Sequence, residues 1–397
     1  MARVPELRFP EFSGEWREVK LGQISRVVGG GTPSTSVSEY WNGAIPWFTP
    51  TEIKSKYCED SKRTITNIGL KNSSAKLLPK GTILLTTRAT IGECCIAKQE
   101  CTTNQGFQNI VAIDGESYNV FLYYLLLTIK RELLKRANGS TFLEISGIEV
   151  KKLRISIPSL PEQQKIADFL SAVDEKITLS QEKITRLEVY KKGMMQKLLS
   201  GEVRFPGFTD AWREVKLGEV ATFSKGKGIS KNDVTNEGVP CIRYGQLYTD
   251  YGEVIKNIIC KTLEAQDLVF ASYNDILIPS SGETAIDLAT ASCIAIVDKV
   301  AIGGDVNIIK TDENGIFLAY YLNTVKKIAI AMLAQGVSVV HLYAQHLKSL
   351  KISIPSLPEQ QRIADFLTAI DDKLTLEKER LEALKRYKQG LLQKMFV

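Results

Sequence analysis

Residues 155–179 read ISIPSLPEQQKIADFLSAVDEKITL, and residues 352–376 read ISIPSLPEQQRIADFLTAIDDKLTL. Of these 25 positions, 20 are identical and the other five differ conservatively. A shorter block, in which WREVKLG follows an RFP motif, stands at residues 8–22 and again at 204–218. Residues 25–120 and 221–316, between the blocks, share no obvious run. The chain is therefore a duplication in which repeated and variable segments alternate.

Each copy of the long repeat begins with the signals of a helix start. Ser159 and Glu162 form an S-x-x-E capping box with Pro161 in the first turn, and Ser356 begins the same pattern in the second copy. The apolar residues that follow keep the 3-4 spacing of a heptad seam. We expect two helices of about 38 residues, roughly 57 Å long. The apolar seam positions are Ile166, Leu170, Val173, Ile177, Ile184, Leu187, Ile363, Leu367, Ile370, Leu374, Leu381 and Leu384.

A helix of this length exposes its seam to water unless something covers it. Either each helix packs on its own domain, or the two helices pack on each other. The heptad period favours a pair, and polar seam residues, with Ser180 matching Glu377 and Lys191 matching Lys388, are of the kind that fixes register. Because a whole domain separates the helices in sequence, an antiparallel coiled coil closes more easily. It would be a spacer with a globular head at each end.

The variable segments indicate mixed α and β structure. Apolar runs such as residues 82–86 and 275–278 are typical of strands, and residues 121–135 are typical of a helix. The sequence predicts an α+β fold in which two α/β domains are separated by the long helices, with a pseudo-twofold internal repeat. We expect the boundaries to follow the blocks. The domains would span residues 1–158 and 203–355, and the spacer helices residues 159–202 and 356–397.

Composition argues against several classes of protein. The chain has 51 Lys and Arg against 45 Asp and Glu, and this net charge of +6 permits a polyanionic partner without requiring one. With His341 and His346 as its two histidines, it offers little for a His-based metal site or a Ser-His-Asp hydrolase. The glycines at 29–31 are not followed by the G-K-[ST] of a P-loop, and the sequence shows no set of residues with the pattern of a catalytic site. We expect no catalytic residue, no metal and no cofactor.

The same sequence predicts a cytoplasmic protein. No apolar run reaches the length of a membrane span, and the N-terminal residues lack the apolar core of a signal peptide. The seven cysteines have no C-x-x-C spacing, so we interpret them as reduced thiols.

Loops of the variable segments carry side chains suited to DNA. Arg, Lys, Asn and Gln can bond base edges, while Ser, Thr and Tyr suit phosphates. Any one such residue is more often plain surface, so the set is a group of candidates. In the first segment they are Thr32, Ser34, Lys54, Lys56, Tyr57, Thr87, Arg88, Asn104 and Gln105. In the second segment they are Lys225, Lys227, Arg243, Tyr244, Gln246, Tyr248, Ser280, Ser281 and Asn307.

With these motifs, the chain resembles the specificity subunit of a type I restriction-modification system. The resemblance covers essentially the whole chain. Its most specific feature is the doubled IPSLPEQQ-x-IADFL block that heads each long helix, and the doubled WREVKLG supports it. Residues 104–107 and 139–142 also look typical of the target recognition domains of this family.

The resemblance implies two target recognition domains that each read one half of a bipartite, asymmetric DNA sequence. The paired helices would set the gap between the half-sites. The implied partners are double-stranded DNA, two methyltransferase subunits that methylate adenine, and two restriction/translocase subunits, with no membrane partner. The subunit itself would have no catalytic activity.

Two other classes of function compete with this interpretation. An enzyme would need a catalytic set, which the sequence does not show. A structural coiled coil or adhesin would need longer heptads or an export signal. Salt-dependent binding to duplex DNA, with and without methyltransferase subunits, discriminates among the three.

Overall fold

The computed structural model describes residues 3–137, 143–263, 267–336 and 339–397, so the family-like stretch at 139–142 lies outside the described residues. The chain divides into two compact units. The first comprises residues 1–180 and 380–397, and the second residues 181–379. Each unit contains one globular head, the beginning of one long helix and the end of the other. We call residues 17–157 head 1 and residues 213–354 head 2.

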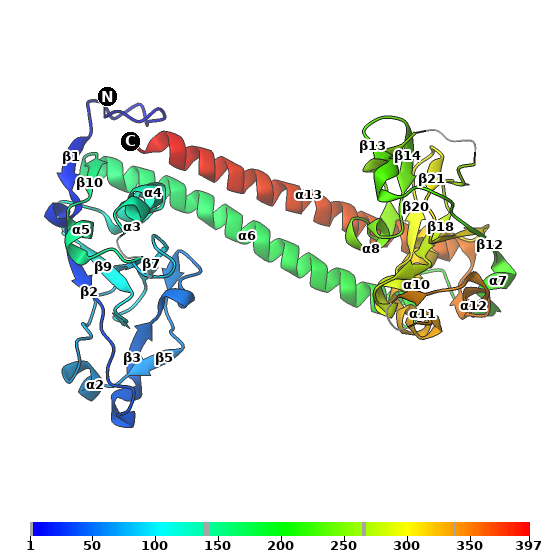
Figure 1. Cartoon of the computed structure of the whole chain (residues 1–397), viewed down its shortest axis with the longest axis horizontal. Helices are drawn as coiled ribbons and strands as arrows, with labels where there is room; N and C mark the ends of the chain where they lie inside the picture. The colour runs from blue at the N-terminus through cyan, green and yellow to red at the C-terminus, as the bar shows by residue number, and fades with distance from the viewer. Residues whose placement is uncertain (1–2, 138–142, 264–266, 337–338) are drawn as a thin grey trace. The chain divides into compact units, whose positions relative to one another are not determined.

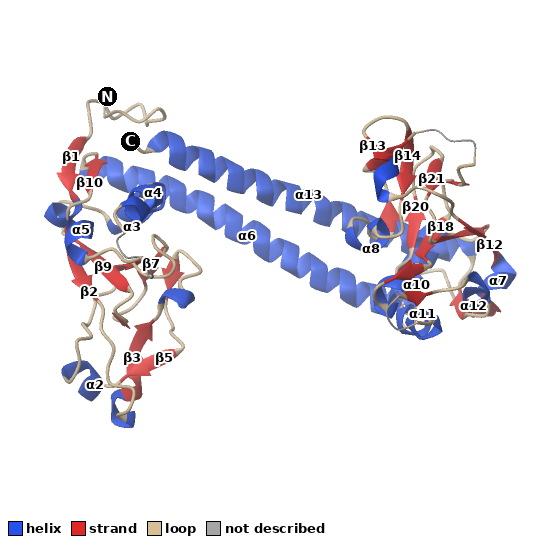
Figure 2. Ribbon diagram, viewed as in Figure 1, coloured by secondary structure: helices blue, strands red, loops and turns tan. Residues whose placement is uncertain are grey.

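The two repeats form helices of almost equal length, α6 (Leu160–Leu199) and α13 (Leu357–Met395), which are the longest in Figure 2. They have 40 and 39 residues, close to the length expected from the heptads. All twelve apolar seam positions are buried or half-buried.

Ion pairs show that the helices run antiparallel. In the second unit, Lys191 Nζ lies 2.7 Å from Asp371 Oδ1 and Lys378 Nζ lies 2.7 Å from Glu188 Oε1, so numbers rise on one helix as they fall on the other. In the first unit, Lys388 Nζ lies 2.6 Å from Asp174 Oδ1. This last pair repeats the first at an offset of 197, with the two helices exchanged. The predicted antiparallel coiled coil is confirmed.

Each long helix also packs on a head. Its seam is therefore covered partly by the other helix and partly by a globular domain. In the first unit, Ile166 and Leu170 join a core with Trp16 and Phe121, and Phe396 from the end of the chain enters the same core. In the second unit, the end of α6 enters the core of head 2 in the same way.

Head 1 is built around two sheets (Figure 1). The larger has the order β2-β9-β6-β7-β4 and the smaller the order β5-β3-β8, while β1 pairs with β10 to join the two repeated blocks in an antiparallel ribbon. The four residues of β6 and those of β7 are all buried, as strands covered on both faces require. The elements are β1 (Arg17–Lys20), α1 (Leu21–Ile24), β2 (Ser25–Gly29), β3 (Trp41–Phe48), β4 (Tyr57–Cys58), β5 (Arg63–Ile65), α2 (Asn67–Lys71), β6 (Ile83–Thr86), β7 (Cys94–Ala97), β8 (Thr102–Thr103), β9 (Phe107–Ala112), α3 (Asn119–Thr128), α4 (Lys130–Lys135), α5 (Gly147–Lys151) and β10 (Arg154–Ile157), with 3-10 turns at Ser38–Tyr40 and Pro50–Glu52.

Head 2 repeats the larger sheet with the order β12-β22-β18-β20-β15, and its second sheet has the order β13-β16-β14-β21-β17. A small sheet pairs β19 with β23, and β11 pairs with β24. The elements are β11 (Arg213–Lys216), α7 (Leu217–Val220), β12 (Ala221–Lys225), β13 (Val234–Thr235), β14 (Val239–Ile242), α8 (Gln246–Thr249), β15 (Val254–Ile255), β16 (Cys260–Thr262), β17 (Phe270–Ala271), β18 (Ile276–Pro279), β19 (Ser281–Gly282), α9 (Ala285–Leu288), β20 (Ser292–Ile294), β21 (Val300–Ile302), β22 (Val306–Thr311), α10 (Gly315–Thr324), α11 (Lys327–Leu333), β23 (Val340–His341), α12 (Ala344–Lys348) and β24 (Lys351–Ile354), with a 3-10 turn at Lys231–Asp233.

The two heads therefore share one scaffold although their sequences show no common run. In both larger sheets, the last two strands pair in parallel and the others antiparallel. In the smaller sheets, β3 pairs in parallel with β8 as β14 does with β21. The duplication extends through the variable segments.

One expected helix is divided. Residues 121–135 form α3 and α4 with a break at Ile129, whose ψ of 16° departs from helical geometry. α3 is buried on most sides, whereas in α4 only Leu133 is buried. The break turns the charged residues of α4 toward the surface.

Among the described residues, no single helix is long and apolar enough to cross a membrane. The bent pair of α10 and α11 meets the requirements for a membrane span by length and composition only.

Candidate nucleic-acid interface

Backbone hydrogen bonds tie together several loops of head 1. Gly31 N donates to Thr103 O at 2.8 Å, and Asn104 N donates to Phe48 O at 3.0 Å. Thr87 N donates to Gly106 O at 2.8 Å and Thr87 O accepts from Ile145 N at 3.2 Å. These bonds join the loops that leave β2, β3 and β6 to the turn before β9. We call this set the loop ring of head 1 (residues 30–32, 48–49, 87–88, 103–106 and 144–145).

Head 2 repeats these bonds one for one. Lys227 N donates to Ile302 O at 3.0 Å, and Gly303 N donates to Ile242 O at 2.8 Å. Ser280 N donates to Asp305 O at 2.7 Å and Ser280 O accepts from Leu342 N at 3.0 Å. The loop ring of head 2 therefore comprises residues 226–228, 242–243, 280–281, 302–305 and 341–342.

The matched positions carry different side chains. Arg88 of head 1 corresponds to Ser281 of head 2. The backbone of Arg88 forms an antiparallel bridge with Glu144, and that of Ser281 pairs in the same way with His341. The turn Asn104-Gln105 corresponds to two glycines in head 2. One backbone thus holds two different sets of hydrogen-bonding groups, as two readers of different DNA sequences require.

In head 1 the candidates Thr32, Arg88, Asn104 and Gln105 lie on the loop ring, whereas Tyr57 lies in β4 next to Lys56. Thr32 Oγ1 and Gln105 Oε1 form a hydrogen bond of 2.5 Å, and Asn104 Oδ1 accepts from the backbone N of Gly106 at 2.9 Å. Arg88 is exposed, and its guanidinium donates to Glu144 Oε2 at 2.7 Å. Exposed candidates are Ser34, Lys54, Tyr57, Arg88 and Gln105, and half-buried ones are Thr32 and Asn104.

In head 2, Lys225, Lys227 and Tyr244 are exposed, and Arg243 and Tyr248 are half-buried. Lys225 Nζ lies 3.1 Å from Asp305 Oδ1, and Lys227 Nζ lies 2.7 Å from Asp267 Oδ2. A cleft of about 340 Å³ brings three candidates together with the sequence around His341. It is lined by Phe223, Ser224, Lys225, Ser280, Asn307, His341, Leu342, Tyr343 and Ala344.

Five candidates are buried and offer DNA little side-chain surface. Thr87 Oγ1 donates to Gly106 O at 3.3 Å, and Asn307 Nδ2 donates to Leu342 O at 3.0 Å. Gln246 Oε1 accepts from the backbone N of Arg243 at 2.9 Å. Their polar groups shape the loops that carry exposed neighbours. The buried five are Thr87, Gln246, Ser280, Ser281 and Asn307.

Lys56 also requires correction as a candidate phosphate contact. Its side chain is only 12% exposed, and Nζ bonds Tyr124 Oη and Ser171 Oγ, each at 2.8 Å. Asp174 Oδ2 lies 3.8 Å away. Burial lowers the pKa of Lys56 to about 8, against the opposing effect of Asp174. Its side chain joins head 1 to α6.

This contact belongs to a junction that both units contain. In the first unit, Tyr124 Oη donates to Asp174 Oδ2 at 2.6 Å and Lys388 pairs with the other oxygen. In the second unit, Tyr320 Oη donates to Asp371 and Lys191 pairs with it. The tyrosine comes from the head, the aspartate from one long helix and the lysine from the other. We call each set a Tyr-Asp-Lys junction.

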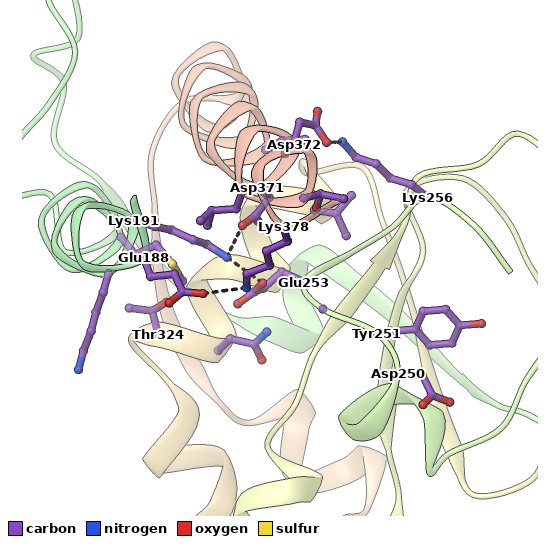
Figure 3. A pocket seen from close by; sticks show the side chains of 18 of the residues that line it. Glu188, Lys191, Asp250, Tyr251, Glu253, Lys256, Thr324, Asp371, Asp372 and Lys378 are labelled. Atoms are coloured by element: carbon purple, nitrogen blue, oxygen red, sulfur yellow. Dashed lines mark hydrogen bonds and ion pairs between the residues drawn. The ribbon is translucent and has the colours of Figure 1, made fainter. Parts of the chain in front are cut away.

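The heads differ in what they add to this junction. Lys56 O accepts from Ile96 N as Glu253 O accepts from Cys293 N, both at 2.8 Å, so Lys56 and Glu253 occupy matched positions. Lys191 Nζ lies 3.3 Å from Glu253 Oε2 and 2.7 Å from Asp371 Oδ1 (Figure 3). Burial opposes the charge of Lys191, but Glu253 and Asp371 together raise its pKa.

Figure 3 shows Lys191 and Asp371 of this second junction at one wall of a cleft of about 1000 Å³ between head 2 and the long helices. Lys378 and Glu188 form an ion pair of 2.7 Å there, and Lys256 pairs with Asp372. Most of the charged side chains that line this cleft pair with one another, between the two helices or across the contact between head 2 and the helices. We therefore interpret the cleft as part of the packing of head 2 on the helices.

The glutamate of the PEQQ motif makes the same tertiary contact in both copies of the repeated block. Arg8 Nε donates to Glu162 Oε1 at 2.8 Å, and its Nη2 donates to Oε2 at 2.8 Å. Arg204 and Glu359 repeat this bidentate pair at 2.8 and 2.7 Å. Both glutamates are buried, so the expected capping residue has a tertiary role, holding the RFP segment to the helix start.

The following glutamine clamps the head. Gln163 Oε1 accepts from Tyr118 N at 2.9 Å, and Gln360 Oε1 accepts from Asn314 N at 3.0 Å. Both amide nitrogens donate to the proline carbonyl that precedes each helix, at 3.1 and 3.0 Å. Sequence reasoning missed these residues, although the identical polar residues in both copies were the available signal.

No group of three or more His, Cys, Asp or Glu side chains placed to hold a metal ion occurs in the part of the chain that the structure describes. The cysteines of that part are free thiols, and Cys94, Cys95, Cys101, Cys241 and Cys293 are buried.

Comparison with known proteins agrees with this architecture. The family described as "Type I restriction modification DNA specificity domain" matches residues 13–189 and 209–386. The MjaIX specificity subunit of a type I restriction enzyme of Methanocaldococcus jannaschii is 30% identical, covering 96% of this chain and 92% of the relative. The MjaVIII specificity subunit of the same organism is 22% identical over 97% of this chain and 92% of its own.

Solved structures of similar fold include the S subunit of a type I restriction-modification system from M. genitalium, with a TM-score of 0.62, 19% identity and 99% of both chains covered. The HsdS subunit from Thermoanaerobacter tengcongensis gives a TM-score of 0.54 at 19% identity, with 98% of both chains covered. The family match covers each copy of the duplication separately. The chain therefore belongs to the DNA specificity subunits of type I restriction-modification systems.

Proposed function

We propose that each head reads one half of a bipartite, asymmetric DNA sequence, with the paired helices setting the gap between the half-sites. The observation that carries this proposal is the pair of loop rings, which have the same backbone bonds and different side chains. Two identical readers would call for a symmetric site, whereas two different readers on one scaffold suit an asymmetric one.

The family assigns this chain the specificity role, and the catalytic activities of such a system lie in other subunits. Type I specificity subunits bind DNA and assemble with those other subunits. We extend this to two methyltransferase and two restriction/translocase subunits, acting on DNA in the cytoplasm. The target recognition domains would span residues 1–158 and 203–355, and the spacer helices residues 159–202 and 356–397.

The exposed and half-buried candidates divide by chemistry. Arg88 and Gln105 in head 1 and Arg243 in head 2 suit base edges, because their side chains can make paired hydrogen bonds. Lysines suit phosphates, whose contacts position a protein without reading sequence. The proposed set is Thr32, Ser34, Lys54, Tyr57, Arg88, Asn104, Gln105, Lys225, Lys227, Arg243, Tyr244 and Tyr248.

The test is to sequence DNA modified by the specificity subunit together with its methyltransferase, using a method that detects methylated adenine. We expect two different short sequences separated by a gap of constant length. Exchanging residues 21–153 for those of a relative should alter one half alone, and a change in both halves would contradict the proposal. These boundaries preserve the repeated ribbon, since Leu21 N donates to Leu153 O in head 1 as Leu217 N donates to Leu350 O in head 2.

The two long helices carry the same series of aromatic and basic side chains, which suits two copies of one partner. Every seventh residue from Phe169 to residue 197 reads Phe, Lys, Lys, Tyr, Lys, and from Phe366 to residue 394 the series is Phe, Lys, Arg, Tyr, Lys. These positions flank the seam. Tyr190 and Tyr387 are 49% and 53% exposed, so both leave ring surface available to a partner, although the Tyr190 ring also contacts Phe366. We call each series a basic-aromatic stripe.

Two stripes of one composition suit two copies of the same acidic and apolar partner surface, which we assign to the methyltransferase subunits. Lys176→Glu and Lys373→Glu reverse one charge in each stripe, and Lys192→Glu is the matched control on another face of α6. Native mass spectrometry should find two methyltransferase subunits on the unmodified chain, one on each single variant and fewer on the double variant. Two subunits on the double variant would contradict this assignment.

A further inference from the structure

We infer that Arg63, which was not among the sequence candidates, reads a base within the half-site of head 1. This inference rests on the proposed function, since it names one specificity-determining residue of that head. Arg63 begins β5, which is the edge strand of the smaller sheet in Figure 1.

Two tryptophans hold the Arg63 side chain in place. Its guanidinium carbon lies 3.5 Å from the ring centroid of Trp41 and 5.4 Å from that of Trp47. The two indoles meet edge to face with centroids 5.1 Å apart, and both are buried. A guanidinium stacked on an aromatic face has its motion restricted while its in-plane N–H groups still point outward.

The same tryptophans connect Arg63 to the loop ring. Trp47 Nε1 donates to Gly31 O at 2.9 Å, and Trp41 Nε1 donates to Ser34 O at 3.0 Å. This loop carries Thr32, whose hydroxyl bonds Gln105. Arg63 therefore lies beside exposed polar groups that are already candidates for DNA contact.

The charge of Arg63 is exposed and not neutralised within the described part of the chain. No carboxylate among the described residues forms an ion pair with it, whereas Arg88 pairs with Glu144 at 2.7 Å. An exposed arginine held by an aromatic face has donors available for an external acceptor. Arg88 must first leave its glutamate.

The scaffold itself does not require an arginine at this position. Arg63 pairs across the sheet with Trp47, and Cys260 pairs with Cys241 at the matched place in head 2. Head 2 thus builds the same strand with a small thiol. A residue that differs between two copies of one scaffold, and that presents donors at the surface, is placed to distinguish their targets.

Guanine is the base class that fits this geometry. A planar guanidinium bonds guanine O6 and N7 together in the major groove, and such a pair discriminates between bases by roughly 5- to 150-fold. A lysine supplies charge but not the planar pair of donors.

The test uses the full-length subunit with its methyltransferase partner and measures how often each base is accepted at every position of the methylated sequence. Arg63→Ala should relax one position of the half-site read by head 1 and leave the other half-site unchanged. Arg63→Lys should not restore it, and Arg63→Gln keeps a planar group over Trp41 as a check on folding. Lys62→Ala is the matched control.

An unchanged methylated sequence in all Arg63 variants of normal thermal stability would overturn the inference. Equal weakening on every sequence would also overturn it, because that result identifies a phosphate contact. If the proposed function itself fails, exchanging residues 21–153 will leave the half-site unaltered, and this experiment separates the two failures.

Discussion

Lys191→Met should destabilise the second unit far more than the equivalent Lys388→Met destabilises the first. Lys191 is 16% exposed and lies between Glu253 and Asp371, whose side chains are 21% and 28% exposed. Methionine keeps the length of the side chain and removes its charge. The two carboxylates then face each other without their shared cation.

The magnitude follows from the degree of burial. Removing one partner of a fully buried ion pair costs about 3–5 kcal/mol, while exposed pairs contribute about 0–1 kcal/mol. At these intermediate exposures we expect a loss of about 2 kcal/mol, which lowers the midpoint of thermal unfolding by about 4–8 °C in a unit of roughly 200 residues.

Lys388 provides the internal control because the sequence around both lysines is repeated. In the first unit, Asp174 has Lys56 Nζ at 3.8 Å and the hydroxyl of Tyr124 at 2.6 Å, so it keeps partners after Lys388 is removed. We expect Lys388→Met to cost less than ~1 kcal/mol. Hydrogen exchange of α10, which carries Tyr320, should accelerate only in the Lys191 variant. Equal losses, or the reverse order, would refute the account of the junctions.

Three further outcomes are expected. Folding lowers the pKa of Lys56 from 10.5 to about 8, so between these pH values the unfolded chain binds a proton at Lys56 that the folded chain has released. The free energy of unfolding should therefore rise with pH in that window, and denaturation measurements on Lys56→Met should not show this rise. Arg88→Ala should cost ~1–3 kcal/mol at one base position, whereas Lys225→Ala should weaken binding to all sequences and reduce the salt slope by ~1, as binding titrations at several salt concentrations would show. Residues 1–200 alone should dimerise through the exposed seam, with each Asp174 facing Lys191 of the other copy, and light scattering that finds only monomers would count against the repeat.

The sequence predicted the long helices well because their signal is local and repeated. Capping residues and a heptad seam need no tertiary information, and the polar seam residues Lys191 and Lys388 do form pairs that fit one antiparallel register. The common scaffold of the heads was not visible, because it is maintained by backbone bonds such as Thr87 N to Gly106 O and Ser280 N to Asp305 O. Backbone bonds place little constraint on side-chain identity.

The candidate site was predicted only in part, since side-chain type does not reveal burial. Lys56 and Asn307 have side chains that suit DNA contacts, but both form hydrogen bonds to groups within the protein. The sequence did not indicate Arg63 as a candidate, because its side chain is held by stacking on Trp41, which is 22 residues away along the chain. Glu162 was assigned a local capping role because its partner Arg8 is distant in sequence.

If the heads are independent readers on equivalent scaffolds, one head can replace the other. The decisive measurement is to replace residues 21–153 with a second copy of residues 217–350 and to sequence the DNA that the chimera modifies with its methyltransferase. Two copies of head 2 should direct methylation to an inverted repeat of the second half-site, with the first half-site lost. Methylation that persists at the original asymmetric sequence would contradict the account.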